Sequence, residues 1–338
     1  WQSDGTVAGT VLVKDIGPGF GSSSPSYLTA IGNTLYFRAD DGVNGRELWK
    51  SDGTEAGTIL VKDLCPGSGT YGIQSLTAVG DKLYFSADDG VNGRELWQSD
   101  GTVDGTVFVK DIYPGSTTSS PQHFAAVSDK LYFRADDGVN GGELWQSDGT
   151  VDGTSLLEDI RIGYISSSPQ SHTAVGNRLY FRADDGKNGI ELWKSDSTED
   201  GTVLVKDISP GGSSSEPQYL TVVGDRLFFH ANDGVYGYEL WQSDGTEDGT
   251  VLVKDIYLGS SSNPYRLTAV GNKLFFRADD GVNGRELWQS DGTAVGTVLF
   301  KDIYPGSDSS SPYGLTVVGD TLYFGADDGV YGKELWIW

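Results

Sequence analysis

The stretch Glu47-Leu48-Trp49-Lys50-Ser51-Asp52-Gly53-Thr54 returns along this chain at a nearly constant interval. Its tryptophan recurs every 48 residues, except for one step of 47 between Trp241 and Trp288. The recurring residues are Trp1, Trp49, Trp97, Trp145, Trp193, Trp241, Trp288 and Trp336. A fixed interval of this length indicates one supersecondary unit copied head to tail. Seven such repeats fill residues 1–338, and we expect them to form a single domain.

Each repeat is expected to contain four short strands. In the first repeat they cover residues 28–31, 35–39, 47–50 and 58–64, which are rich in β-branched and aromatic side chains. Gly, Asn and Asp residues typical of turns separate them. No stretch has the periodicity of a helix. Four antiparallel strands in each of seven units predict an all-β fold, the seven-bladed β-propeller.

The two ends of the chain are expected to complete each other. Residues 10–16 have the pattern of a fourth strand, and residues 315–336 have the pattern of a first, second and third strand. A blade shared between both termini would close the ring and remove two free sheet edges. Because Trp1 and Trp336 are duplicates, one of them should lie outside the regular strand pairing.

The composition limits the classes of partner. A net charge of −24 argues against nucleic acid and anionic membranes, which require clustered basic residues. No apolar run approaches the ~18 residues that membrane insertion requires. Cys65 is the single cysteine, so an internal disulfide cannot form. The chain has no methionine and begins within a repeat, so we expect it to be a processed piece of a larger polypeptide or assembly.

The repeated octapeptide resembles that of the bacterial ELWxxDGT repeat family. The likeness extends over the whole chain, with one departure where Ser197 replaces the glycine of the motif. The resemblance implies a propeller-like repeat of large secreted or cell-surface bacterial proteins. It implies a localisation and no defined activity.

The most regular positions are expected to be structural. We expect each tryptophan to pack in the core between neighbouring blades. In the Ser-Asp-Gly-Thr turn, the aspartate should bond to its own backbone and the glycine should adopt a positive φ, as in a tight hairpin.

The connection from each fourth strand to the next first strand is the most variable segment. It contains the single missing residue, between Trp241 and Leu267, and it is rich in Ser, Gly and Tyr. Rigid aromatic residues among small polar ones are typical of adaptable binding surfaces, and loops on a rigid scaffold often carry function. The alternative is a solvated loop under weak constraint. The candidate ligand-binding residues are Tyr27, Gln74, Gln122, His123, Gln170, Tyr219, Tyr265, Arg266 and Tyr313. We expect a ligand at the shortened connection.

The turn between the second and third strands concentrates acidic residues and should lie on the same face as that variable connection. Its Asp, Asn and Glu oxygens are of the type that Ca²⁺ prefers. The candidate metal ligands are Asp40, Asp41, Asn44, Glu47, Asp88, Asp89, Asp136, Asp137, Asp184, Asp185, Asp279, Asp280, Asp327 and Asp328. The alternative is that Asp and Asn cap the turn and that Glu47 pairs with Arg38 or Arg46 across the hairpin.

Catalysis has little support in the sequence. The three histidines, His123, His172 and His230, occupy non-equivalent positions, although the first two could approach each other. Carboxylates recur in seven similar copies, whereas an active site needs one asymmetric constellation. We therefore expect no catalytic residues.

These observations favour a non-enzymatic, multivalent binding or adhesion module of a secreted or cell-surface protein. A glycan or a cell-surface protein is the expected partner, met through the acidic, Ser/Tyr-rich face, and several weak sites would act together. One alternative is a structural or assembly propeller stiffened by Ca²⁺. The other is an enzyme with its active site in the central funnel.

Overall fold

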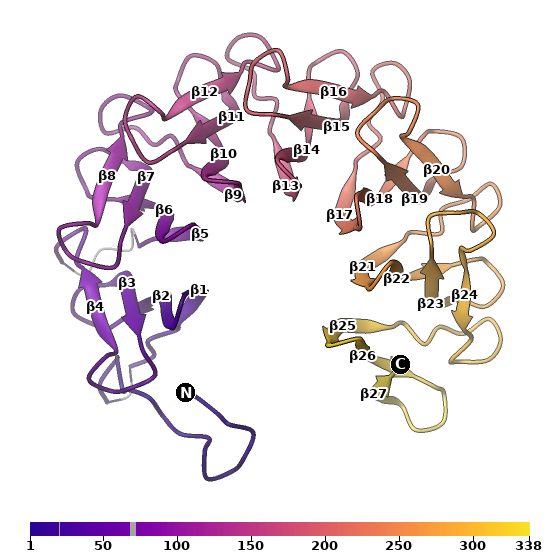
Figure 1. The fold of residues 1–338 in the computed structure, drawn as a ribbon, viewed down its shortest axis with the longest axis horizontal. Helices are drawn as coiled ribbons and strands as arrows, with labels where there is room; N and C mark the ends of the chain where they lie inside the picture. The colour runs from indigo at the N-terminus through magenta and orange to yellow at the C-terminus, as the bar shows by residue number, and fades with distance from the viewer. Residues whose placement is uncertain (20, 68–71) are drawn as a thin grey trace. The chain divides into compact units, whose positions relative to one another are not determined.

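The computed structural model describes residues 1–19, 21–67 and 72–338, which form strands, turns and loops without a helix (Figure 1). In the described ranges there is accordingly no helix with the length and apolar character needed to cross a membrane. The chain divides into two compact units, residues 1–172 and 173–338. A single domain over residues 1–338 stays a prediction.

The first unit contains three antiparallel sheets, each with four strands in chain order. The strands are β1 (Ser26–Ile31), β2 (Thr34–Asp40), β3 (Arg46–Ser51), β4 (Ile59–Lys62), β5 (Gln74–Val79), β6 (Lys82–Asp88), β7 (Arg94–Ser99), β8 (Val107–Lys110), β9 (Gln122–Val127), β10 (Lys130–Asp136), β11 (Gly142–Ser147) and β12 (Ser155–Glu158).

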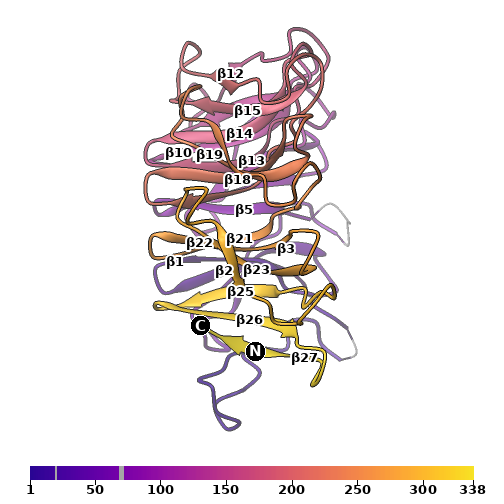
Figure 2. The same cartoon turned by 90° about the vertical axis from the view of Figure 1, so that its right-hand side faces the viewer.

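The second unit contains three further four-stranded sheets and one sheet of three strands. Its strands are β13 (Gln170–Val175), which begins at the unit boundary, β14 (Arg178–Asp184), β15 (Ile190–Ser195), β16 (Val203–Lys206), β17 (Gln218–Val223), β18 (Arg226–Asn232), β19 (Tyr238–Ser243), β20 (Val251–Lys254), β21 (Tyr265–Val270), β22 (Lys273–Asp279), β23 (Arg285–Ser290), β24 (Val298–Lys301), β25 (Tyr313–Val318), β26 (Thr321–Asp327) and β27 (Lys333–Ile337). Figure 2 shows β25, β26 and β27 side by side.

The seven sheets are successive blades of a β-propeller fold, as the repeats predict. Residues 10–16 do not form the predicted fourth strand in this structure. That segment forms only an isolated bridge, in which Gln2 and Val11 exchange two backbone hydrogen bonds of 2.9 Å. The reason is that a strand needs a partner of comparable length, and only Gln2 pairs with this segment. Trp1 is 82% exposed, whereas Trp336 lies opposite Phe324 in regular pairing, so Trp1 is the duplicate outside the sheets.

Within each unit, core clusters combine residues of two consecutive blades. Trp97 belongs to a cluster with Leu83 and Phe85 of its own blade and with Tyr36 and Leu48 of the preceding blade. Its ring meets that of Phe108 edge to face, with 5.6 Å between the centroids. Burying one such large apolar side chain stabilises a fold by roughly 1.5–3 kcal/mol. The predicted core position of the repeated tryptophan is therefore confirmed in the regular blades.

The Ser-Asp-Gly-Thr turn has the expected chemistry. Asp52 Oδ1 accepts hydrogen bonds from the backbone N–H and the hydroxyl of Thr54, at 2.9 and 2.7 Å. Gly53 has a φ of 88°, which favours glycine. Ser197, which replaces this glycine in one copy, adopts a φ of 82° despite its Cβ.

The turn between the second and third strands lies against the variable connections, as expected. The N–H of Asp136 donates to the carbonyl of Ser119 in the preceding connection, at 3.0 Å. On the other side of the same turn, the N–H of Gly142 donates to the hydroxyl of Ser166 in the following connection, at 2.8 Å. This turn is thus held between two connections on one face of its blade.

Candidate binding site

A bulge shapes the beginning of each first strand whose pairing the structure describes. In β21, Tyr265 lies opposite Arg277 and Thr268 lies opposite Phe275, so two residues of β21 face one residue of β22. The first of these two, Arg266, has a φ of 59°. A positive φ recurs at the equivalent position of all seven copies, namely Tyr27, Ser75, His123, Ser171, Tyr219, Arg266 and Gly314. A bulge redirects its side chain, and a non-glycine residue held in this region costs roughly 1–3 kcal/mol.

The bulge exposes several of the residues that the sequence proposes as ligand contacts. Tyr27, Tyr219 and Tyr313 are 42%, 38% and 46% exposed. The other candidates divide into exposed residues, His123 and Arg266, and half-buried residues, Gln74, Gln122, Gln170 and Tyr265. Only Tyr219, Tyr265 and Arg266 gather at one place. Of the other six, Gln122 and His123 are neighbours on β9, and Tyr27, Gln74, Gln170 and Tyr313 belong to four other blades.

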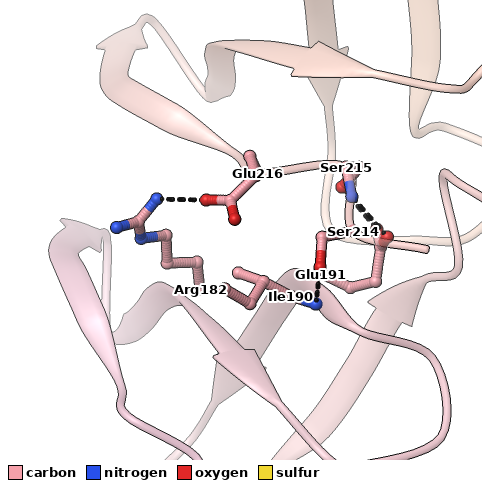
Figure 3. Close-up of polar contacts among 6 residues, drawn as sticks. All are labelled: Arg182, Ile190, Glu191, Ser214, Ser215 and Glu216. Atoms are coloured by element: carbon pink, nitrogen blue, oxygen red, sulfur yellow. Dashed lines mark hydrogen bonds and ion pairs between the residues drawn. The ribbon is translucent and has the colours of Figure 1, made fainter. Parts of the chain in front are cut away.

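The glutamate of the repeated tripeptide is part of the structural core. Glu191 is fully buried and accepts hydrogen bonds from the N–H groups of Ile208 and Ser215, at 3.0 and 2.9 Å. It also accepts one from the Ser215 hydroxyl at 2.5 Å. Figure 3 shows the bond from the Ser215 N–H. Burial raises the pKa of Glu191 to about 7. The same arrangement holds Glu95, Glu143, Glu239 and Glu286 against the connection that follows each of them.

The predicted pairing of Glu47 with Arg38 or Arg46 is wrong. Glu47 is buried and accepts a hydrogen bond of 3.2 Å from the N–H of Leu64. The side chain therefore faces the connection after its blade instead of the neighbouring strand. Burial raises its pKa to about 7.

The acidic turns are capped by their own side chains. Asp41 Oδ1 accepts from the N–H groups of Val43 and Asn44, at 2.9 and 2.8 Å, and its Oδ2 accepts from the Asn44 amide at 2.8 Å. Asp40 accepts from the N–H of Gly42 at 2.8 Å. In the described part of the chain, no group of three or more His, Cys, Asp or Glu side chains is placed to hold a metal ion. The hydrogen bonds show that the aspartates cap their own turns. They do not test for calcium, so a calcium site at these turns stays a prediction.

Two histidines approach each other, as the sequence suggests. The rings of His123 and His172 meet edge to face at 6.2 Å, and His172 Nδ1 contacts the backbone oxygen of His123. Burial lowers the pKa of His172 to about 3, so this ring is neutral at physiological pH. Cys65 is half-buried, and burial raises the pKa of its thiol, which disfavours the reactive thiolate.

The second unit has a cavity of about 190 Å³ at the start of β21. Its walls combine aromatic, amide and basic side chains. The residues that matter for its chemistry are Tyr219, His230, Asn263, Tyr265, Arg277 and Arg285. This cavity adjoins the connection that is one residue shorter than the others, where the sequence places the expected ligand.

The aromatic side of the cavity is ordered by ring contacts. The rings of Tyr219 and Tyr265 meet nearly at right angles, with 4.9 Å between centroids. Tyr219 also meets His230 edge to face at 5.8 Å, and His230 stacks on Tyr238 at 4.6 Å. His230 Nδ1 donates to the carbonyl of Pro264 at 3.1 Å, which leaves Nε2 as an acceptor. Burial lowers the pKa of His230 to about 4, so the ring is neutral at physiological pH.

The basic side of the cavity comes from β22 and β23. The guanidinium group of Arg277 lies 4.6 Å from the ring centroid of Tyr265, and that of Arg266 lies 5.0 Å from it. Burial, followed by the nearby charge of Arg285, lowers the pKa of Arg277. The cavity therefore concentrates positive charge beside two tyrosines.

The missing residue does not itself create the cavity. The shortening lies upstream of the cavity, in a tight turn where the N–H of Ser260 donates to the carbonyl of Tyr257 at 2.7 Å. Ser262 then regains the usual position, because its hydroxyl donates to Glu239 at 2.6 Å. Side-chain identity is what distinguishes this site from its copies.

The sequence prediction missed Asn263, Arg277, Arg285 and the site role of His230. A signal was present in the second strands, where equivalent positions read Arg38, Ser86, Arg134, Arg182, His230, Arg277 and Gly325. This variation marks a position that faces the cavity in one blade. Whether a residue at this position forms part of a site depends on which connection its side chain contacts. The repeat period alone does not show this contact.

Comparisons with known proteins identify the fold. No protein-family model matches the chain, and no curated protein matches it in sequence. The computationally designed Ika8 protein matches with a TM-score of 0.53 and 18% identity, over 96% of this chain and 86% of its own. A prolyl endopeptidase matches with a TM-score of 0.55 and 12% identity, over 94% of this chain and 50% of its own. Oligopeptidase B from Leishmania major matches with a TM-score of 0.53 and 11% identity, over 91% of this chain and 46% of its own.

The chain spans about half the length of these two peptidases. At such identities the likeness shows the β-propeller fold alone.

Proposed function

We propose that the protein is a non-enzymatic binding module of a secreted or cell-surface bacterial protein, and that its ligand is a glycan. The observation that most supports this proposal is the cavity of about 190 Å³ beside Tyr219 and Tyr265. Exposed aromatic faces pack against the C–H groups of sugars, because the negative π face attracts their partial positive charge. The amide of Asn263 and the guanidinium groups add planar donors for oxygen atoms.

Repetition of a related arrangement supports multivalent binding. In the first unit, Arg38 lies over the ring of Tyr27 at 4.8 Å, which resembles the 4.6 Å contact of Arg277 with Tyr265. Several weak sites on one molecule gain greatly in affinity when they engage a repetitive ligand together. A surface polysaccharide is a ligand of this type.

The buried glutamates support a non-enzymatic role. Raised carboxyl pKa values often mark active sites, but structural networks raise them too. Here the same raised pKa of about 7 recurs at Glu47, Glu95, Glu143, Glu191 and Glu239. Their oxygens accept hydrogen bonds from the following connection, so the carboxylates serve the fold.

We also propose that residues 10–13 complete the last blade and so close the ring. The last blade leaves apolar surface uncovered, because Leu335 is 75% exposed whereas Leu48 and Leu96 at equivalent positions are fully buried. In the first unit, Ile16 packs with Phe37 and Trp49. Its equivalent Leu64 packs in the same way with Phe85 and Trp97 of the blade that follows it. If the ring does not close, the same uncovered surface favours an assembly role for the chain.

A glycan array probed with the full chain tests the binding function. We expect selective binding that weakens in the Tyr219→Ala and Tyr265→Ala variants. Tyr331, which is 78% exposed on an acidic turn, provides the matched control, and Tyr331→Ala should bind as the parent does. Silence of the folded chain across a broad array would contradict the proposal.

A further inference from the structure

The cavity beside Tyr219 is basic, although the protein has a net charge of −24. Arg277 and Arg285 line it, and Arg266 adjoins it through Tyr265. Among the described residues, none of these three guanidinium groups has a hydrogen-bond or ion-pair partner. The Nε of Arg277 is buried with no acceptor. A buried donor without a partner costs free energy, so this arrangement is suited to an acceptor supplied from outside.

Two other copies of the same position supply an acceptor from the chain itself, whereas the Nε of Arg134, like that of Arg277, is buried without one. Arg182 forms an ion pair of 2.8 Å with Glu216 in the following connection (Figure 3). Arg38 donates to the carbonyl of Ile73 at 3.2 Å. The residue that corresponds to Glu216 in the connection after Arg277 is Ser311, which carries no charge.

The backbone at these two positions is the same. Glu216 has a φ of 51° and Ser311 has a φ of 48°. The difference between the two copies therefore lies in the side chain. One copy neutralises its arginine internally, and the other leaves the arginine open to a ligand.

We propose, on the basis of the proposed glycan-binding function, that this cavity binds the carboxylate of an acidic sugar residue. Arg277 and Arg285 hold the carboxylate, and Tyr219 and Tyr265 pack against the sugar ring. The volume of about 190 Å³ lies below the roughly 300–1,000 Å³ of pockets for drug-sized ligands, so it suits one sugar residue.

Specificity follows from the same groups. Guanidinium–carboxylate pairs combine charge with parallel hydrogen bonds, and they are among the strongest polar contacts in proteins. A neutral sugar leaves both arginines unpaired and is rejected for that reason. A simple carboxylic acid lacks the ring that the tyrosines contact. Neutral His230 lines the same cavity beside Tyr219, and its Nε2 accepts a hydrogen bond from a sugar hydroxyl.

Titration calorimetry with sodium glucuronate tests the proposal on the full chain. Methyl glucoside serves as the neutral match, and sodium acetate supplies the acid without the ring. We expect glucuronate to bind at least about tenfold more tightly than either, and added salt to weaken its binding. Array binding of neutral glycans is measured in parallel.

Two variants address the arginine directly. Arg277→Gln removes the charge, and Ser311→Glu places a carboxylate where Glu216 stands in the other copy. Both should abolish glucuronate binding, and Ser311→Glu should melt no lower than the parent because it adds an internal ion pair. Arg46→Gln is the control, since Arg46 is exposed and corresponds to Arg285 in the first blade.

The outcomes separate this inference from the proposed function. If methyl glucoside binds as tightly as glucuronate and Arg277→Gln changes nothing, the acidic specificity is overturned while glycan binding stands. If acetate or a tetraglutamate peptide matches glucuronate, recognition of a sugar is overturned at this site. If no glycan binds the folded chain at all, both proposals fail.

Discussion

The hydroxyl of Ser215 donates a hydrogen bond of 2.5 Å to the carboxylate of Glu191, which lies in the preceding blade. Both residues are buried, with at most 1% of their surfaces exposed. This contact fastens the connection that carries the variable residues to a rigid strand. The candidate binding positions therefore depend on a network of buried polar groups beneath them.

Removing the Ser215 hydroxyl should destabilise the second unit. In Ser215→Ala, Glu191 loses one donor while it remains buried, so unfolding should become easier by about 1–3 kcal/mol. Urea denaturation followed by tryptophan fluorescence measures this change. Ser213→Ala is the matched control, because Ser213 is exposed in the same connection. Equal stabilities of the two variants would contradict the structural role of the bond.

The buried glutamates should make the fold less stable as pH rises from about 4.5 to 7. Burial raises the pKa of Glu191 from 4.5 to about 7, so the folded state holds a proton that the unfolded chain has released. The contribution of this group is fully present below pH 4.5 and is lost as pH rises through 7. His230 acts in the opposite direction, because its pKa is lowered to about 4 and its protonation favours the unfolded state.

A comparison of variants isolates the glutamate. The decrease in melting temperature between pH 5 and pH 8 should be smaller in Glu191→Gln than in the parent, because the variant has lost one titrating group. Glu334→Gln is the control, since Glu334 belongs to the same tripeptide but is exposed in the last blade. An unchanged pH dependence in Glu191→Gln would refute the assignment.

Replacing Ser197 with glycine should stabilise the protein. Ser197 has a φ of 82°, which glycine adopts without the steric cost of a Cβ, and the equivalent residues Gly53 and Gly245 both have a φ of 88°. We expect a gain of roughly 1 kcal/mol in the free energy of unfolding for Ser197→Gly. Ser197→Ala keeps the Cβ and should bring no gain. Thermal melting of the three proteins provides the measurement.

The proposed closure of the ring predicts a specific disulfide. In a regular blade, the hydroxyls of Ser51 and Thr58 lie 2.7 Å apart, at the end of the third strand and just before the fourth. Trp338 and Thr10 occupy the equivalent positions at the chain ends. With Cys65 replaced by serine, the Thr10→Cys and Trp338→Cys pair should oxidise within one molecule, as non-reducing electrophoresis would show. Thr10 already contacts the Ser3 hydroxyl at 2.7 Å, so a Ser3→Cys and Thr10→Cys pair is the positive control. Cross-links only between molecules would indicate assembly instead of closure.

The recurrence of the tryptophan motif predicts the blades because the same short motif marks each of them. The strands of the first repeat, the cap that Asp52 forms on Thr54 and the core position of Trp97 all follow from short-range pattern. The strand expected at residues 10–16 is not formed in the structure, because a short-range pattern does not determine which segment will pair with it. A strand forms only when another segment pairs with it.

The candidate binding site follows from the sequence only in part. Variation among the copies identifies Tyr219, Tyr265 and Arg266 as candidates, and the structure gathers these three. The variation among the copies does not by itself identify Arg277, because the role of Arg277 depends on the uncharged Ser311 in the next connection. Such a relationship joins residues more than thirty positions apart, and only folding brings their elements together.

The sequence by itself determined the repeat, the all-β blades and the tight turns, because each follows from interactions within a few residues. The tertiary structure decided which polar groups are satisfied. It buried Glu191 against Ser215, paired Arg182 with Glu216 and left Arg277 without an acceptor. The physical reason is that desolvation and charge pairing depend on distances across blades, which local pattern does not fix.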